Sequence, residues 1–168
     1  MLELVVLTAI GVMSRLLPHV PNFTAVGGIG LFSGARYGVK KGLVVTGVTM
    51  FISDAIVGFH PLVWATYGSL LASVLLGAAF LKRRDGYRIA AFTIGSGLLF
   101  FIVTNFAVWA QGLWYPKTVA GLIDCYVMAI PFLRNSLSGD AFYSALLFGI
   151  EAISVVRIRR PSGAIEGA

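Results

Sequence analysis

The stretch Lys82-Arg83-Arg84-Asp85-Gly86-Tyr87-Arg88 separates the two longest apolar runs of the chain, which cover residues 62–81 and 89–110. A helix needs about 20 mostly apolar residues to cross the hydrocarbon core of a bilayer. Each run therefore predicts a membrane-spanning helix, and the basic residues between the runs predict a short connection. Cytoplasmic loops of membrane proteins carry an excess of Lys and Arg, so we expect this connection to lie on the cytoplasmic side.

The composition of the whole chain indicates the same class. Of 168 residues, 58% are hydrophobic and 12% are charged, whereas soluble domains carry about 25% charged residues. The chain is too apolar to be disordered, and a soluble domain of this size could not bury so much apolar surface. The single cysteine, Cys125, excludes an intramolecular disulfide. Ten of the thirteen Lys and Arg residues flank apolar runs, so we expect no nucleic-acid partner despite the net charge of +6.

Two further basic clusters lie around residues 36–41 and around residues 157–160. If all three clusters are cytoplasmic, the apolar runs must alternate between the two sides of the membrane. The sequence then predicts an all-α integral membrane bundle of six transmembrane helices with both termini cytoplasmic. We expect a single transmembrane domain over residues 1–156 and a short basic cytoplasmic tail over residues 157–168. The predicted spans cover residues 2–17, 23–35, 42–59, 62–81, 89–110 and 141–156.

Three segments need separate treatment. Residues 119–133 contain Asp124 and Pro131, and the charge pattern leaves no crossing for them. We therefore expect a long outer loop over residues 111–139 that carries a short interfacial or re-entrant helix, and Asp140 could cap the span that follows. Residues 23–35 would reach only about 20 Å as a helix, which leaves a straight helix or a broken one. The first run has Glu3 where a signal peptide has basic residues, so we interpret it as a retained span.

Asp54 lies inside a predicted span, where an ionisable residue costs about 2.5–3.5 kcal/mol on insertion scales. Such a residue contacts a ligand or an ion, carries a proton, or forms a structural pair. Arg15 and Arg134 are the candidate partners for such a pair. Arg15 could also reach the outer headgroups, because a long side chain can keep its charge in water. The sequence leaves these alternatives open.

The outer loops and the outer ends of the spans carry the residues that we expect to bind a ligand. Asn105 and Trp109 are four residues apart and share one helical face, where an amide beside an indole suits a flat organic molecule. A structural role is the alternative, since Asn22 can cap a helix and Trp109 can belong to an interfacial aromatic belt. The predicted ligand-binding residues are Asn22, Asp54, His60, Asn105, Trp109 and Arg134, supported by His19 and Trp114.

The chemistry of these side chains suggests roles for them. Arg134 or Arg15 would suit an anionic group, Asp54 a cation or a hydrogen-bond donor, and the tryptophans a ring. The motifs HExxH, CxxC and Gly-x-Ser-x-Gly do not occur in the sequence. We therefore expect no catalytic residue, no metal site and no cofactor.

Four segments form a recognisable pattern: Arg15-Leu16-Leu17-Pro18-His19-x-Pro21-Asn22-Phe23-Thr24, Ile52-Ser53-Asp54 through Gly58-Phe59-His60, Thr104-Asn105-Phe106-x-x-Trp109 and Pro131-Phe132-x-Arg134-Asn135. This pattern resembles a family of small bacterial multispan membrane proteins that has no assigned function. The resemblance extends over about residues 10–149 and brings no chemistry with it.

A looser resemblance concerns the S-components, the substrate-binding subunits of energy-coupling-factor vitamin transporters. Leu31-Phe32-x-Gly34-Ala35-x-x-Gly38, followed by Ser53-Asp54, is similar to their glycine-rich second and third spans. This resemblance implies six spans, both ends in the cytoplasm, a vitamin-like ligand bound from the outer side and an energising transport module as partner. Many S-components carry Ala-xxx-Ala in the first span, whereas here Ala9 is followed four residues later by Met13. A solitary carrier is therefore the alternative.

Together these features predict a multi-pass protein of the bacterial cytoplasmic membrane that captures and transports a small organic molecule from the outer side. Its expected partners are the lipid bilayer, the ligand and an energising module. Two alternatives remain, a non-transporting accessory or assembly protein and an intramembrane enzyme acting on lipid. Only Asp54 lies at membrane depth among the acidic residues, which argues against the enzyme.

Overall fold

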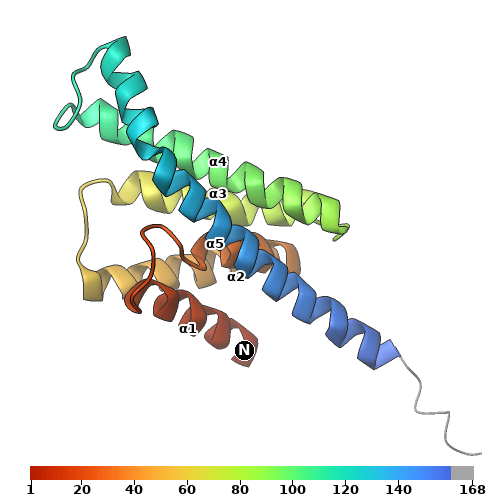
Figure 1. Ribbon diagram of the computed structural model, residues 1–168. Coiled ribbons are helices and arrows are strands. Elements are labelled where there is room, and N and C mark those ends of the chain that lie inside the picture. Colours follow the sequence, from red (N-terminus) through yellow and green to blue (C-terminus); the bar gives the residue numbers. More distant parts are fainter. Residues whose placement is uncertain (160–168) are drawn as a thin grey trace, which may run out of the picture.

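The computed structural model describes the backbone of residues 1–159 and the side chains of residues 1–154. Within these residues the chain is all-helical, with five helices and no strand (Figure 1), which confirms the predicted fold class. The predicted tail begins inside the last helix and otherwise lies outside the described residues. The helices are α1 (Leu2–Leu16), α2 (Val26–Val57), α3 (Val63–Phe80), α4 (Gly86–Gln111) and α5 (Val119–Arg159).

Two of these helices, α3 and α4, are long and apolar enough to cross a membrane. They match the two apolar runs on either side of the basic stretch at residues 82–88. α1 has only 15 residues, and basic residues at positions 36–41 interrupt the apolar pattern of α2. Length and composition alone therefore single out α3 and α4.

α2 reverses its direction at Gly38. The backbone there has φ 79° and ψ 175°, a combination that is favourable only for glycine. A Cβ atom placed on Gly42 would lie 3.0 Å from the backbone nitrogen of Gly34, and one placed on Gly30 would lie 3.5 Å from Oγ1 of Thr46. Both pairs are centred on position 38, so the two parts of α2 pack against each other as an antiparallel hairpin.

The two segments of α2, residues 26–37 and residues 39–57, correspond to two apolar runs that the sequence predicted as separate spans. Together with α1, α3, α4 and α5 they make six helical segments. The first segment is about 18 Å long at 1.5 Å per residue. It is therefore a short helix that ends at a glycine turn, and it is shorter than the hydrocarbon core of about 30 Å.

The prediction of a long outer loop over residues 111–139 is wrong. α5 is helical from Val119 to Arg159 and includes Pro131, and the connection between α4 and α5 is only residues 112–118. Proline removes one backbone donor and crowds the preceding turn, but packing against a neighbouring helix can hold such a helix together. Residues 119–133 are thus helical as expected, yet their helix continues through the segment predicted as the last span.

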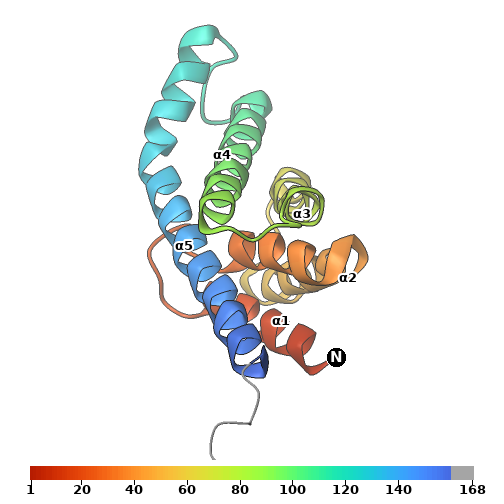
Figure 2. The same cartoon turned by 90° about the vertical axis from the view of Figure 1, so that its right-hand side faces the viewer.

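Contacts with α4 support the first half of α5. The Tyr126 hydroxyl donates to the carbonyl oxygen of Ile102 at 2.7 Å, and the Phe101 and Tyr126 rings meet edge to face at 5.4 Å. α5 then runs along one side of the molecule, beside α4 at one end and toward α1 at the other (Figure 2). Asp140 consequently lies inside α5, and the expectation that it caps a helix start is wrong.

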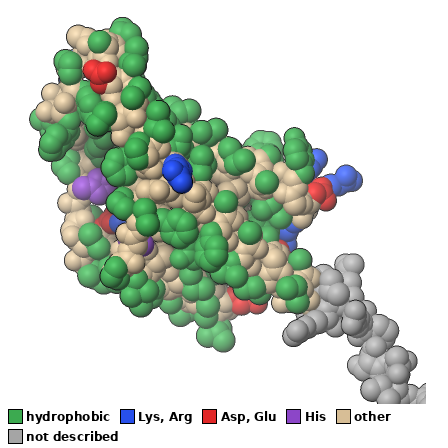
Figure 3. Space-filling model, viewed as in Figure 1, with side chains coloured by type: hydrophobic (Ala, Val, Ile, Leu, Met, Phe, Trp, Pro, Cys, Tyr) green, Lys and Arg blue, Asp and Glu red, His purple; other side chains and the backbone are tan. Residues whose placement is uncertain are grey.

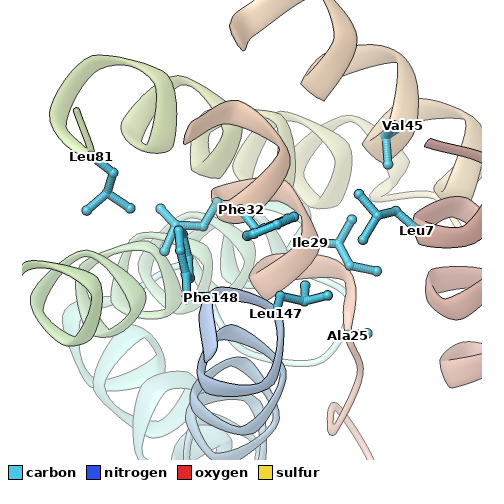
Figure 4. Packing of buried hydrophobic residues seen from close by; sticks show 9 residues of the cluster. Leu7, Ala25, Ile29, Phe32, Val45, Leu81, Leu147 and Phe148 are labelled. Carbon is cyan, nitrogen blue, oxygen red and sulfur yellow. The ribbon is translucent and has the colours of Figure 1, made fainter. Parts of the chain in front are cut away.

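The apolar core lies around the first segment of α2. Ile29 and Phe32 meet Phe148 of α5 and Leu7 of α1 (Figure 4). The Phe32 and Phe148 rings pack edge to face with centroids 5.0 Å apart, a favourable aromatic geometry. The core therefore packs along this segment from Ala25 to Phe32, and the start of the segment, at Val26, also borders the cavity described next.

Candidate functional site

A polar cavity of about 350 Å³ lies between the start of α2 and helices α3, α4 and α5. A second hollow of about 270 Å³ adjoins it and shares five of its lining residues. We call the two together the chamber. In Figure 3, histidine side chains (purple) lie at a hollow in the surface. The hollow is beside the projecting part of the molecule that the end of α4 and the start of α5 form in Figure 1. The shared lining residues are Asn22, His60, Thr66, Phe100 and Ser136.

The first charged group of the chamber is Arg15, near the end of α1. Its guanidinium donates to the carboxylate of Asp54 on α2, and its Nη1 lies 2.8 Å from the sulfur of Met50. Asp54 is 1% exposed and stands behind Arg15, away from the chamber wall. Of the two partners that the sequence allowed for Asp54, the structure selects Arg15.

The second charged group is Asp140 of α5. It is 7% exposed and lines the larger hollow. Its carboxylate lies against Gly27 of α2, where a Cβ atom would collide with Oδ1, and 3.4 Å from the position of a Cβ atom on Gly97 of α4. Asp140 forms no ion pair with any residue whose side chain is described. A buried carboxylate without a charged partner is costly, so its place on a cavity wall needs an explanation.

Four of the predicted ligand-binding residues meet at the chamber. Asn22 and His60 line both hollows, His19 lines the larger one and Asn105 lines the smaller one. Asn22 has φ 66°, a backbone conformation that asparagine tolerates better than most residues. The Asn105 amide donates to the carbonyl oxygen of Phe101 at 2.8 Å, so its side-chain oxygen is the atom left for another partner.

The other four predicted residues lie away from the chamber walls. Asp54 is held behind Arg15. The indole of Trp109 donates to the carbonyl oxygens of Pro116 and Thr118, at 3.1 and 3.2 Å. Trp114 is 79% exposed in the α4–α5 connection. Arg134 is exposed on α5.

Sequence reasoning missed Asp140 and Ser136 as wall residues. They are four residues apart and share one face of α5. The spacing can be read from the sequence. It places the two residues on one face only if a single helix includes both of them, whereas the sequence analysis assigned residues 111–139 to a loop. Ser96 of α4 and Thr24 also line the larger hollow, and short polar side chains at such positions are hard to distinguish from ordinary helix-packing residues.

A second polar cluster lies at the other end of the first α2 segment. Glu151 of α5 pairs with Arg36 at 3.0 Å and also with Arg84. Arg84 donates to the carbonyl oxygen of Ala35 at 2.9 Å. This cluster, which we call the Glu151 cluster, ties the α2 turn and the α3–α4 connection to α5. The basic stretches around residues 36–41 and 82–88 therefore lie at one end of the molecule.

The donor set of the described residues contains no group of three or more His, Cys, Asp or Glu side chains that could hold a metal ion. The chamber instead combines one guanidinium, one carboxylate, two imidazoles and several hydroxyls. These groups can form hydrogen bonds and charge contacts with a small polar molecule.

Residues 1–161 of the chain match a protein family described as "Family of unknown function (DUF6580)". The chain belongs to this family. A search of curated proteins and a search of solved structures each found no significant match. Membership confirms the resemblance to a family of unassigned function, and the function must be argued from the chamber itself.

Proposed function

We propose that this member of the family is a six-span membrane protein that captures a small organic molecule in the chamber and carries it across the membrane. The observation that carries the proposal is a polar chamber with buried charges inside a molecule whose helices turn large apolar side chains outward. Soluble domains show the opposite distribution, with apolar side chains inside and charged ones outside. Ligand sites of small organic molecules commonly have volumes of about 300–1,000 Å³, a range that includes the larger hollow.

The exposed side chains support six spans. Each of the helices α2, α3, α4 and α5 presents at least one large apolar side chain that is half exposed or more. Examples, in the order of the helices, are Phe51, Trp64, Ile102 and Phe142. Their buried faces hold small hydroxyl residues such as Ser53, Ser73 and Ser96. Membrane helices pack through small and hydroxyl residues, so this pattern favours a lipid environment for the segments that length alone does not single out.

The Glu151 cluster supports the orientation. It gathers two of the three basic stretches at one end of the molecule, and basic loops favour the cytoplasmic side. The chamber is lined by residues from the connections at the other end of the first α2 segment, namely His19, Asn22 and His60. We therefore propose that the ligand enters from the outer side of a bacterial cytoplasmic membrane.

The test compares two tryptophan variants of one helix. Ser136 lines both hollows, whereas Ser138 is exposed on the same helix. The full chain is purified gently from its native membrane as wild type, Ser136→Trp and Ser138→Trp, and bound small molecules are identified by mass spectrometry. We expect a stoichiometric organic compound with the wild type and Ser138→Trp, and its loss with Ser136→Trp.

Two outcomes would overturn the proposal. One is a compound that is retained equally by Ser136→Trp, because a filled chamber could not hold it. The other is a wild-type preparation that carries only bulk lipids and releases no compound that Ser136→Trp lacks.

A second candidate function has its own observation. An apolar groove of about 560 Å³ between α4 and α5 is lined by small residues that include Ala90, Ala141, Ala145 and Gly149. Small residues allow close approach of another helix. A non-transporting accessory protein would use such a groove for a partner helix, and one stoichiometric partner protein would then co-purify with Ser136→Trp as well as with the wild type.

A further inference from the structure

We infer that Asp140 binds a positively charged nitrogen of the ligand, so that the chamber selects a small organic cation such as a protonated amine. The inference rests on the proposed function, because it names the ligand class of the same chamber. It differs from the sequence-based expectation, in which Asp54 was the residue suited to a cation. Three structural observations carry it.

The first observation is that the structure makes room for this carboxylate. Asp140 projects from α5 against Gly27 of α2 and near Gly97 of α4. A Cβ atom on Gly27 would collide with Oδ1, and a Cβ atom on Gly97 would lie 2.6 Å from Cδ2 of Leu137. Two helices thus lack a side chain where the Asp140 carboxylate sits. The carboxylate therefore fits into the space beside these two glycines, on the chamber wall.

The second observation is the charge of the chamber. Asp54 is neutralised by Arg15, whereas Asp140 has no ion-pair partner among the side chains that the structure describes. The other titratable groups of the wall are His19 and His60. When Asp140 is ionised, the charges of Arg15, Asp54 and Asp140 sum to minus one. A positively charged group of the ligand would pair with Asp140 and so offset the free-energy cost of burying its negative charge.

The third observation is that Asp140 lines the chamber close to the start of α2. α2 begins at Val26, and the Ala25 amide is already satisfied by the hydroxyl of Ser14 at 3.0 Å. The amide of Gly28, in the first helical turn, is near the Asp140 carboxylate. The start of a helix favours a negative charge. The carboxylate thus lies between the start of α2 and the chamber, where a cation in the chamber can reach it.

A purely structural role at the start of α2 is the competing explanation, and a matched set of probes separates the two. The probes are protonated amines from methylammonium to benzylammonium, with the corresponding carboxylates from formate to benzoate. Binding to the purified full-length protein is measured by equilibrium dialysis for the wild type, Asp140→Asn and Asp124→Asn. Asp124 is exposed on the same helix, so its variant is the control.

We expect at least one amine to bind the wild type and Asp124→Asn equally, and to bind Asp140→Asn at least about tenfold more weakly, the factor that one charge-assisted hydrogen bond provides. Equal amine binding to the wild type and Asp140→Asn, or binding of carboxylates alone, would overturn the inference. If carboxylates bind the wild type and this binding is lost in Ser136→Trp, the chamber binds an anion. The inference about Asp140 would then fail, but the proposed function would still hold. The absence of any compound lost from Ser136→Trp would contradict the proposed function itself.

A measurement on the wild type covers the case in which Asp140→Asn does not fold. Dicyclohexylcarbodiimide reacts with buried carboxyl groups in apolar surroundings, and peptide mass spectrometry identifies the labelled residue. We expect labelling at Asp140 that the bound amine slows at least about tenfold, because access to the carboxylate is then blocked. Labelling that no amine of the series slows would overturn the inference.

Discussion

Arg15 of α1 and Asp54 of α2 form an ion pair across 39 positions of sequence, and the carboxylate of this pair is almost fully buried. The pair fixes α1 against the second segment of α2. It also places the guanidinium on the chamber wall and the carboxylate behind it. The same contact therefore serves both the packing of the helices and the charge of the candidate site.

Removing one member of this pair should cost more stability than removing both. Asp54→Leu leaves the guanidinium of Arg15 without its partner, and loss of one partner of a buried pair costs about 3–5 kcal/mol. The double variant Arg15→Met with Asp54→Leu leaves no unpaired charge at this position, so we expect a smaller loss of unfolding free energy. Unfolding of the purified proteins in detergent measures both effects. A double variant that is less stable than either single variant would contradict this account.

The turn at Gly38 should depend on glycine. Nothing lies within 4 Å of a Cβ atom placed on Gly38 or on Gly47, so only the backbone distinguishes the two positions. Gly38→Ala must adopt φ 79° and ψ 175°, and we expect it to lose about 1–3 kcal/mol of unfolding free energy. Gly47→Ala lies in regular helix and should gain up to about 1 kcal/mol. Equal effects of the two substitutions on the thermal midpoint would contradict this account, because alanine would then fit the backbone at position 38 as well as it fits regular helix.

The Glu151 cluster should contribute through its shared carboxylate. Glu151→Gln weakens the pairs with Arg36 and Arg84 together, and we expect a loss of about 1 kcal/mol, near the upper end for partly exposed pairs. Asp85→Asn is the control, because its contact with Arg88 is 3.8 Å long and exposed. Thermal unfolding at low and high salt measures both variants. The effect of Glu151→Gln should shrink at high salt, and an effect no larger than that of Asp85→Asn would refute the role of the cluster.

The six spans proposed above predict a definite pattern of labelling from the two sides of the membrane. The native Cys125 is buried, so single cysteines introduced elsewhere can be read with an impermeant maleimide on sealed membrane vesicles. We expect Lys41→Cys and Arg83→Cys to react only from the cytoplasmic side, and Pro61→Cys and Lys117→Cys only from the outer side. Reaction of Lys41→Cys and Pro61→Cys from the same side would exclude a crossing by residues 42–59.

The sequence predicted best where one physical effect dominates. The positions of α3 and α4 were predicted from two long apolar runs that flank a basic stretch. Such long apolar runs strongly favour helices, so no other local signal competed with this prediction. The start of α5 was also placed well, at Val119. Its continuation was not, because Pro131 and Asp124 weaken the apolar pattern, whereas contacts such as that of Tyr126 with Ile102 depend on tertiary packing.

The candidate site was predicted in part for a related reason. Asn22, His19 and His60 belong to short connections, whose polar residues stand out in an apolar sequence, and they do border the chamber. Asp140 was assigned to a helix start because the preceding residues were interpreted as a loop. The space for its carboxylate lies beside Gly27 and Gly97, which are distant in sequence, and no local pattern shows that three helices meet there.

The length of α5 has a mechanical consequence. Its 41 residues form a rod of about 62 Å, and this rod carries Ser136 and Asp140 at the chamber and Glu151 at the opposite cluster. A tilt of the rod about a point between Asp140 and Glu151 moves these two groups in opposite directions. A ligand that pulls on Asp140 would therefore strain the contacts of Glu151 with Arg36 and Arg84, so that α5 connects the chamber with the opposite end of the molecule.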